Sequence, residues 1–205
     1  MHRDTSNVDG PRRDRDIPEL LIAAATQLFA ENGFASTSVQ RVVDAAHVTK
    51  GAMYYYFDSK DELLYEIYAR LLRLQMARLQ MFADSNVPIE VRIRDAAADV
   101  ALTTLASLDS VKVFLRSIPE LSAEMRVVVS AERHAYHELF CTLIRAGQAE
   151  GKFDPKVEAS LVSNYFFGAI HYLTTWYNKD GDISPVEIAT TYSQLLMASL
   201  QNHQD

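Results

Sequence analysis

One stretch of the chain, residues 36–63, constrains the fold more than any other. It reads STSVQRVVDAAHVTKGAMYYYFDSKDEL. Four of its apolar residues recur at i, i+3, i+4 and i+7, the spacing of one apolar helix face. They are Val39, Val42, Val43 and Ala46. A turn at His47 and a second short helix from Thr49 follow. This pattern predicts a helix-turn-helix whose second helix is short enough to lie in the major groove of DNA.

Two polar residues are expected to cap these short helices. Thr37 can accept a hydrogen bond from the backbone N–H of Gln40, whose side-chain amide can reach back to complete a capping box. Thr49 is the expected N-cap of the second helix, which we place at about residues 50–55. His47 fits the turn because histidine visits left-handed backbone conformations more than most residues do.

The run VTKGAMYYYFDSKDELL, residues 48–64, resembles the signature of the TetR type of repressor. The match covers nearly every defined position of that signature, and one departure is His47, where such proteins usually have glycine in the turn. The resemblance implies an all-α, nine-helix architecture. A three-helix DNA-binding domain would precede a helical domain for ligand binding and dimerisation.

The resemblance also implies which residues meet double-stranded operator DNA. Tyr54 and Lys60 would contact phosphates, while residues 49–52 and Tyr55 would face the groove, where a threonine methyl group or an alanine can touch thymine methyl groups. The full expected set is Thr37, Gln40, Arg41, Thr49, Lys50, Gly51, Ala52, Tyr54, Tyr55 and Lys60. The alternative is an ordinary helical hairpin with tyrosines on its surface.

Charge gives this assignment little support. Residues 1–60 hold 7 Lys and Arg against 8 Asp and Glu, and the whole chain has a formal net charge of −7. DNA-binding domains usually display a basic surface. The basic residues in or beside the expected DNA-binding surface are Arg12, Arg13, Arg15, Arg41, Lys50 and Lys60. We therefore expect few phosphate contacts per subunit and a modest salt dependence.

Helical patterns and turn residues divide the chain into three parts. Residues 1–16 are expected to be a flexible arm, residues 17–60 the DNA-binding domain, and residues 61–205 the ligand-binding and dimerisation domain. Helix starts are expected near Pro18, after Ser59, near Pro88, at Asp109, near Leu121, at Asp154-Pro155 and at Ser184-Pro185. No segment predicts a strand.

The N-terminal arm has two interpretations. Arg12, Arg13 and Arg15 could reach DNA, or the arm could be a solvated tail in which the neighbouring aspartates cancel their charge. The N-terminus lacks the apolar centre of a signal peptide, and no segment approaches the roughly 20 apolar residues of a membrane span. With one cysteine, Cys141, the chain has no intrachain disulfide, and we expect a cytoplasmic protein. Cys141 is interpreted as a buried apolar residue, with redox sensing as the alternative.

The last two helices carry more apolar residues than one exposed face explains. The segment LVSNYFFGAIHYLTTWY, residues 161–177, is apolar nearly all round, which is typical of a helix buried on several sides. Either one domain or two subunits could bury it. The resemblance implies a homodimer through the last two helices, in which Gly168 and Ala169 would allow close approach.

The expected effector is a small apolar molecule held in the C-terminal domain. Eight residues are expected to line its cavity, although the same residues could simply fill a core: Phe114, Met125, Val129, Tyr136, Phe140, Phe167, His171 and Trp176. The ending WYNKDGDISPVEIATTYSQLLMASL is similar to that of regulators of fatty-acid and steroid catabolism. An acyl or acyl-CoA compound is therefore expected, with drug-like aromatics as the alternative.

No enzymatic constellation is visible. The chain has no glycine-rich phosphate loop, nucleophile elbow or distinctive acid pair, so we expect no enzyme and no cofactor. His134 and His137, at i and i+3, could ligate a metal, but a solvated helix face is favoured and no metal is expected. We interpret the chain as a ligand-responsive repressor. The competing interpretation is a helical interaction or enzyme domain that does not bind DNA.

Overall fold

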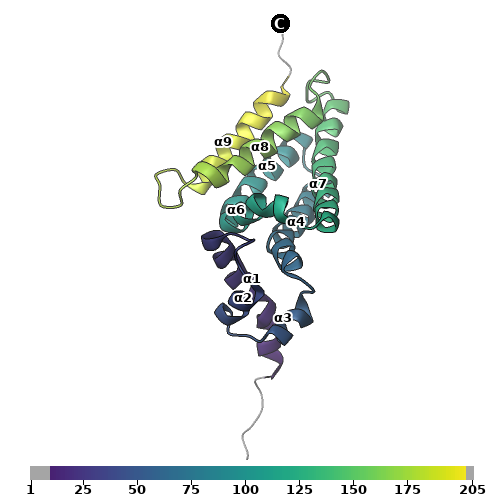
Figure 1. Cartoon of the computed structure of the whole chain (residues 1–205). Coiled ribbons are helices and arrows are strands. Elements are labelled where there is room, and N and C mark those ends of the chain that lie inside the picture. The colour runs from purple at the N-terminus through teal and green to yellow at the C-terminus, as the bar shows by residue number, and fades with distance from the viewer. Residues whose placement is uncertain (1–9, 202–205) are drawn as a thin grey trace, which may run out of the picture.

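The computed structural model describes residues 10–201, which form nine α-helices, one short 3₁₀ helix and no strand (Figure 1). The helices are α1 (Gly10–Asn32), α2 (Val39–Ala45), α3 (Lys50–Tyr56), α4 (Lys60–Asp84), α5 (Ile89–Ala106), α6 (Leu108–Ser117), η1 (Ile118–Glu120), α7 (Ala123–Ala149), α8 (Ala159–Trp176) and α9 (Pro185–Leu200). The all-α, nine-helix prediction is confirmed for this range. None of these helices is long and apolar enough to cross a membrane.

The first three helices gather at one end of the molecule (Figure 1). The apolar stripe of α1, which includes Leu21 and Phe29, is buried against α2 and α3. Val42 and Val43 from α2 and Met53 from α3 complete this small core, and all three are buried. Burying these side chains is what holds two seven-residue helices in place, since helices this short are unstable alone.

The 25-residue helix α4 joins this end to the rest of the molecule. It begins after the N-cap Ser59, whose hydroxyl accepts from the backbone N–H of Glu62. At 1.5 Å per residue it is about 37 Å long. It packs against α1 at one end and against α5, α6 and α7 further along, so one hydrophobic core runs through both parts.

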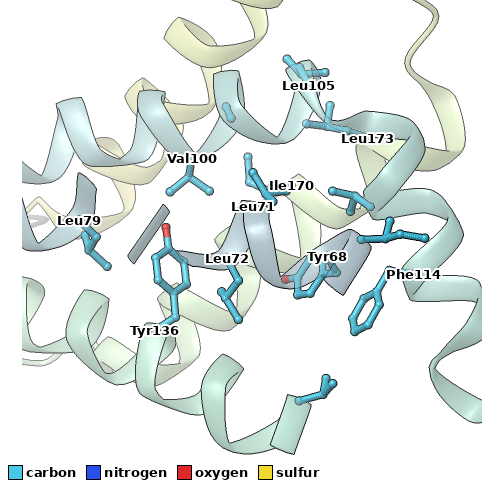
Figure 2. Close-up of a cluster of buried hydrophobic side chains, with 14 of the residues drawn as sticks. Tyr68, Leu71, Leu72, Leu79, Val100, Leu105, Phe114, Tyr136, Ile170 and Leu173 are labelled. Atoms are coloured by element: carbon cyan, nitrogen blue, oxygen red, sulfur yellow. The ribbon is translucent and has the colours of Figure 1, made fainter. Parts of the chain in front are cut away.

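The remaining helices form a bundle around the second half of α4. Helix α5 lies between α4 and α9, while α7 packs on α4 and α8. Figure 2 shows the buried cluster at their junction, in which the rings of Tyr68 and Phe114 stack with centroids 4.1 Å apart. This packing leaves a cavity beside α4.

Three helix starts differ from the sequence-based expectation. Helix α1 begins at Gly10 and runs through Pro18, so part of the expected arm is helical; residues 1–9 lie outside the described range. Helix α8 begins at Ala159, because Asp154 accepts from the N–H of Lys156 in a turn instead of capping a helix. Asp109 lies inside the first turn of α6, not at its N-cap.

Candidate DNA interface and ligand cavity

The turn between α2 and α3 adopts the expected geometry. His47 has φ 55°, the left-handed region, and its N–H donates to the carbonyl of Asp44 at 3.2 Å. Thr49 caps α3 as predicted, its hydroxyl accepting from the N–H of Ala52 at 3.0 Å. The turn and cap together fix the direction in which α3 leaves the core.

The N-cap of α2 is Ser38, not Thr37. The Ser38 hydroxyl accepts from the N–H of Arg41 at 3.3 Å, and Gln40 donates to Asp44 at 2.7 Å instead of reaching back. Thr37 is 1% exposed and donates to the carbonyl of Gly33 at 2.8 Å. Both its predicted roles, as a cap and as a DNA contact, are therefore corrected: Thr37 holds the loop between α1 and α2.

One face of α3 and the start of α2 remain open to solvent. Tyr55 is 81% exposed and Tyr54 is 50% exposed, whereas Met53 lies on the opposite side of α3 and is fully buried. A Cβ atom added to Gly51 would meet only the Thr49 hydroxyl, at 3.8 Å, so a partner can approach the backbone there closely. The other exposed members of the predicted set are Gln40, Arg41, Thr49 and Lys50, while Ala52 is half-buried.

Lys60 is largely committed within the protein. Its Nζ donates to the carbonyls of Phe34 at 2.8 Å and Thr37 at 3.1 Å, and it lies 4.1 Å from the centroid of the Phe34 ring. An ammonium group has three N–H donors, so one is left for a phosphate. The structure adds a positioning role to the predicted contact, because Lys60 ties the start of α4 to the loop before α2.

A cavity of about 640 Å³ lies between α4, α5, α6, α7 and α8. Four of the eight predicted residues line it: Val129, Tyr136, Phe167 and His171. Its apolar wall is completed by side chains from four helices and η1. They are Leu71, Leu72, Val100, Val111, Ile118 and Ile170.

The other four predicted residues lie outside the cavity. Phe114 is fully buried and stacks on Tyr68, and Phe140 is fully buried and stacks on Phe166 at 5.6 Å. Met125 packs against the core, and Trp176 is 40% exposed near the end of α8. The prediction selected large apolar residues, and half of them serve packing instead.

Sequence reasoning missed the polar part of the cavity. The polar residues that line the cavity include Gln75, Thr104, Arg126, Ser130, Arg133, His134, His137 and Asn164. A signal was present in α7: Arg126, Val129, Arg133 and Tyr136 recur at helical spacing, so one face mixes basic and apolar side chains. A face buried in a dry core would not include two arginines.

The electrostatics of the cavity favour a negatively charged ligand group. Arg126 and Arg133 contribute two cations, against one carboxylate, Glu138, which also pairs with Arg145 at 3.3 Å. Burial, and then the charge of Arg133, lowers the pKa of His171 to about 4, so its imidazole is neutral at pH 7. The cavity therefore holds a net positive charge beside apolar walls.

A short link connects the cavity to the DNA-binding end. The η1 link, residues 118–122, follows α6, and its Ile118 lines the cavity. Glu120 accepts from the N–H of Ala35 at 3.0 Å, and Asp61 at the start of α4 accepts from the N–H of Ser122 at 2.9 Å. The short segment that carries Ile118 is thus hydrogen-bonded to both α4 and the loop before α2.

Within the described range, one cluster combines potential metal ligands. The Nδ1 atom of His137 lies 3.6 Å from the Cys141 sulfur and 3.6 Å from a Glu138 oxygen. Sequence reasoning paired His137 with His134, whereas the structure brings it to Cys141. The buried thiol lies 3.3 Å from the Ser163 hydroxyl, and burial raises the pKa of Cys141, so the thiol stays protonated.

Helices α8 and α9 present an apolar stripe to solvent. Along α8 it comprises Leu161, Tyr165, Gly168, Tyr172 and Trp176, all exposed, at i, i+4, i+7, i+11 and i+15. On α9, Val186 and Leu195 are also exposed, at 65% and 53%, but their nine-residue spacing places them on opposite sides of that helix. Exposed apolar surface of this extent on adjacent helices marks an interface.

A helix-turn-helix, a cavity joined to it by one long helix, and an apolar two-helix face define a class: dimeric DNA-binding regulators that respond to a ligand. Residues 21–67 match the family described as bacterial regulatory proteins of the tetR family, and residues 86–200 match the tetracyclin repressor-like C-terminal domain. The chain belongs to the TetR family of transcriptional regulators.

Individual proteins show the same relationship. The chain is 26% identical over 198 residues to the HTH-type transcriptional repressor KstR2 of Rhodococcus jostii, covering 96% of this chain and 94% of that one. It shares its fold with the TetR family regulator PfmR of Thermus thermophilus, with TM-score 0.78, 26% identity, and 89% and 99% of the two chains covered. AibR, solved with isovaleryl coenzyme A and operator DNA, has TM-score 0.73 and 19% identity over 88% and 98% of the chains.

Proposed function

We propose that this chain is a homodimeric repressor that leaves a palindromic operator when an anionic acyl compound, of the acyl-CoA class, occupies its cavity. The observation that carries the proposal is the pairing of an apolar wall with Arg126 and Arg133 in one cavity. Residues 17–60 would bind DNA, and residues 61–205 would bind the effector and the second subunit. Regulation would operate in the cytoplasm by binding alone, without a chemical step.

The cavity fits this ligand class in size and charge. Its volume of about 640 Å³ lies within the range of small-molecule sites, roughly 300–1,000 Å³. Leu71, Leu72 and Ile170 offer the apolar contacts that an acyl chain needs, and the arginines offer donors to a carboxylate or phosphate. A cationic aromatic drug would meet two positive charges. The AibR complex supports the acyl-CoA class because a protein of this fold holds such a ligand.

Helix α4 provides the route from cavity to DNA. It lines the cavity with Tyr68, Leu71, Leu72 and Gln75, and its first residue, Lys60, is bonded to the loop before α2. A ligand that binds more tightly to one orientation of α4 shifts the population toward that orientation. The shift in free energy cannot exceed the difference between the ligand's binding free energies for the two orientations. The two DNA-binding ends would then no longer match the spacing of the half-sites.

Operator release, measured by fluorescence anisotropy with a panel of acyl-CoAs, free fatty acids and planar aromatics, tests the proposal. Acyl-CoAs should release the DNA, and Arg133→Gln should raise the half-effective concentration about tenfold, since one hydrogen bond to a charged group contributes about 1.5–3 kcal/mol. Arg94→Gln is the matched control, because Arg94 is exposed and pairs with its neighbour Asp95. Release by aromatics alone would reject this ligand class.

A further inference from the structure

The hydroxyl group of Tyr136 has no hydrogen-bond partner in the structure. Tyr136 lines the cavity from α7 and is only 6% exposed, yet its oxygen is buried and unpaired. Figure 2 shows the ring rising from α7 with its oxygen toward Val100 of α5. Buried hydroxyl groups in proteins nearly always have a partner, so an unpaired one inside a cavity calls for a specific explanation.

The polar groups nearest to the Tyr136 hydroxyl form hydrogen bonds with other residues and not with it. The carbonyl of Val100 accepts from Gln75 at 3.4 Å and from Thr103 at 3.2 Å. Asp99, whose charge acts on Tyr136, accepts from Arg78 at 2.8 Å. Tyr136 is therefore left facing the space that a ligand would occupy.

Two of the other polar side chains that line the cavity are hydrogen-bonded to each other. Gln75 of α4 donates to the hydroxyl of Thr104 of α5 at 3.1 Å, and both residues are nearly fully buried. With Tyr136 they define a polar subsite in which three helices each contribute one side chain. A plain hydrocarbon chain placed there would leave the tyrosine hydroxyl unsatisfied.

We propose that Tyr136, with Gln75 and Thr104, binds an oxygen function, a ketone or a hydroxyl, on the hydrophobic part of the effector. The natural ligand is thus an oxygenated acyl compound and not a plain fatty acyl chain. This inference rests on the proposed function. On α7, Arg126 is ten residues from Tyr136, about 15 Å along the helix axis, whereas Arg133 is three residues away, about 4.5 Å. The oxygen function therefore lies far from the anionic group when Arg126 holds that group.

The hydroxyl stays a donor at physiological pH. Burial, and then the charge of Asp99, raises the pKa of Tyr136 well above its usual value. A protonated phenol can donate to a ketone oxygen, and it can both donate to and accept from a hydroxyl group.

The first test needs no ligand. Tyr136→Phe removes a hydroxyl that makes no bond, so its melting temperature should equal or exceed that of the wild type. Tyr65→Phe is the matched control, because the Tyr65 hydroxyl donates to Glu132 at 2.6 Å, and its melting temperature should fall. A decrease in Tyr136→Phe as large as in Tyr65→Phe would overturn the inference, since the hydroxyl would then have a partner.

The second test compares pairs of acyl-CoAs of equal chain length, with and without a keto or hydroxyl group near the far end. The wild type should bind the oxygenated member at least about fivefold more tightly, the contribution of one net hydrogen bond. Tyr136→Phe should remove this preference and leave the affinity for the plain member unchanged. Equal affinities in the wild type overturn the subsite, whereas no operator release by any acyl-CoA overturns the proposed function.

Discussion

The imidazole of His171 links the stability of this protein to pH. Its pKa of about 4 in the folded chain lies below the value of about 6.5 for an unfolded chain, because burial and Arg133 disfavour the charged form. Between these values the unfolded chain binds more protons than the folded one. The stabilising contribution is therefore complete above pH 6.5 and is lost as the pH falls toward 4.

Replacing His171 with Phe should flatten this dependence. Between pH 7 and pH 4 the wild type should lose up to about 3 kcal/mol more unfolding free energy than His171→Phe, because each pKa unit corresponds to about 1.4 kcal/mol. Urea unfolding at half-unit pH steps measures the difference. As a control, the difference in unfolding free energy between the wild type and His171→Phe should stay constant between pH 7 and pH 8. Parallel curves from pH 7 to pH 4 would contradict a buried neutral imidazole.

Thr37 and Lys60 show what a motif can predict about single residues. Both occupy positions where the family resemblance implies DNA contact, yet Thr37 is buried and Lys60 bonds two carbonyls. Adjacent Thr37 and Ser38 can each cap a helix, and only the packing of α1 against the loop decides which one turns inward. A pattern in the chain therefore predicts where the DNA-binding surface lies, but not the orientation of every side chain on it.

At the scale of helices, the N-caps with one available side chain were predictable. Thr49 and Ser59 cap α3 and α4 as expected, and α9 begins at the predicted Ser184-Pro185, where Ser184 forms a full capping box with Glu187. The polar subsite of the cavity was not predictable, because it depends on which faces of α4, α5 and α7 meet. Helical periodicity indicates that a face is buried, but not whether a neighbouring helix or a ligand buries it.

A further prediction concerns the η1 link. If it carries part of the coupling between cavity and DNA, Glu120→Gln should weaken the hydrogen bond to Ala35 and reduce the ratio of operator affinities without and with ligand. We expect a three- to tenfold smaller ratio, about 0.6–1.4 kcal/mol of coupling, measured by anisotropy with the acyl-CoA that releases the operator best.

Glu124→Gln is the control for the link, because Glu124 is exposed in the first turn of α7, four residues further along the chain. An unchanged ratio in Glu120→Gln would assign the whole coupling to α4. A ratio reduced equally in both variants would point to a general charge effect and would also contradict the role of the link.

At the scale of the whole molecule, the surface formed by the apolar stripe of α8 and the adjacent α9 is the expected dimer interface. Gly168 lies in its centre, is exposed, and has no atom within 4 Å of an added Cβ. Gly168→Arg should therefore fold normally as a single chain but place a charge in the bundle between two subunits. Analytical ultracentrifugation should show monomers at micromolar concentrations, with operator affinity reduced at least about a hundredfold by loss of the second half-site contact.

Val127→Arg is the matched control, since Val127 is 69% exposed and lies on α7, a helix outside the expected interface, so this variant should leave the dimer intact. The circular dichroism spectra of both variants should match that of the wild type. A dimer of unchanged stability in Gly168→Arg would place the subunit interface on another surface.

The length of α4 determines how far a small tilt at the cavity displaces the DNA-binding end. Its cavity residues begin at Tyr68 and end at Gln75, so they lie about 12–22 Å along the axis from Lys60. A tilt of about 5° with its pivot at the cavity displaces the far end of such a lever by roughly 1–2 Å. In a symmetric dimer two levers swing at once, which changes the distance between the DNA-binding ends by up to about 4 Å against a half-site spacing of about 34 Å. A tilt of only a few degrees would thus shift both α3 helices by a sizeable fraction of a major-groove width of about 12 Å, relative to half-sites whose spacing on the DNA stays fixed.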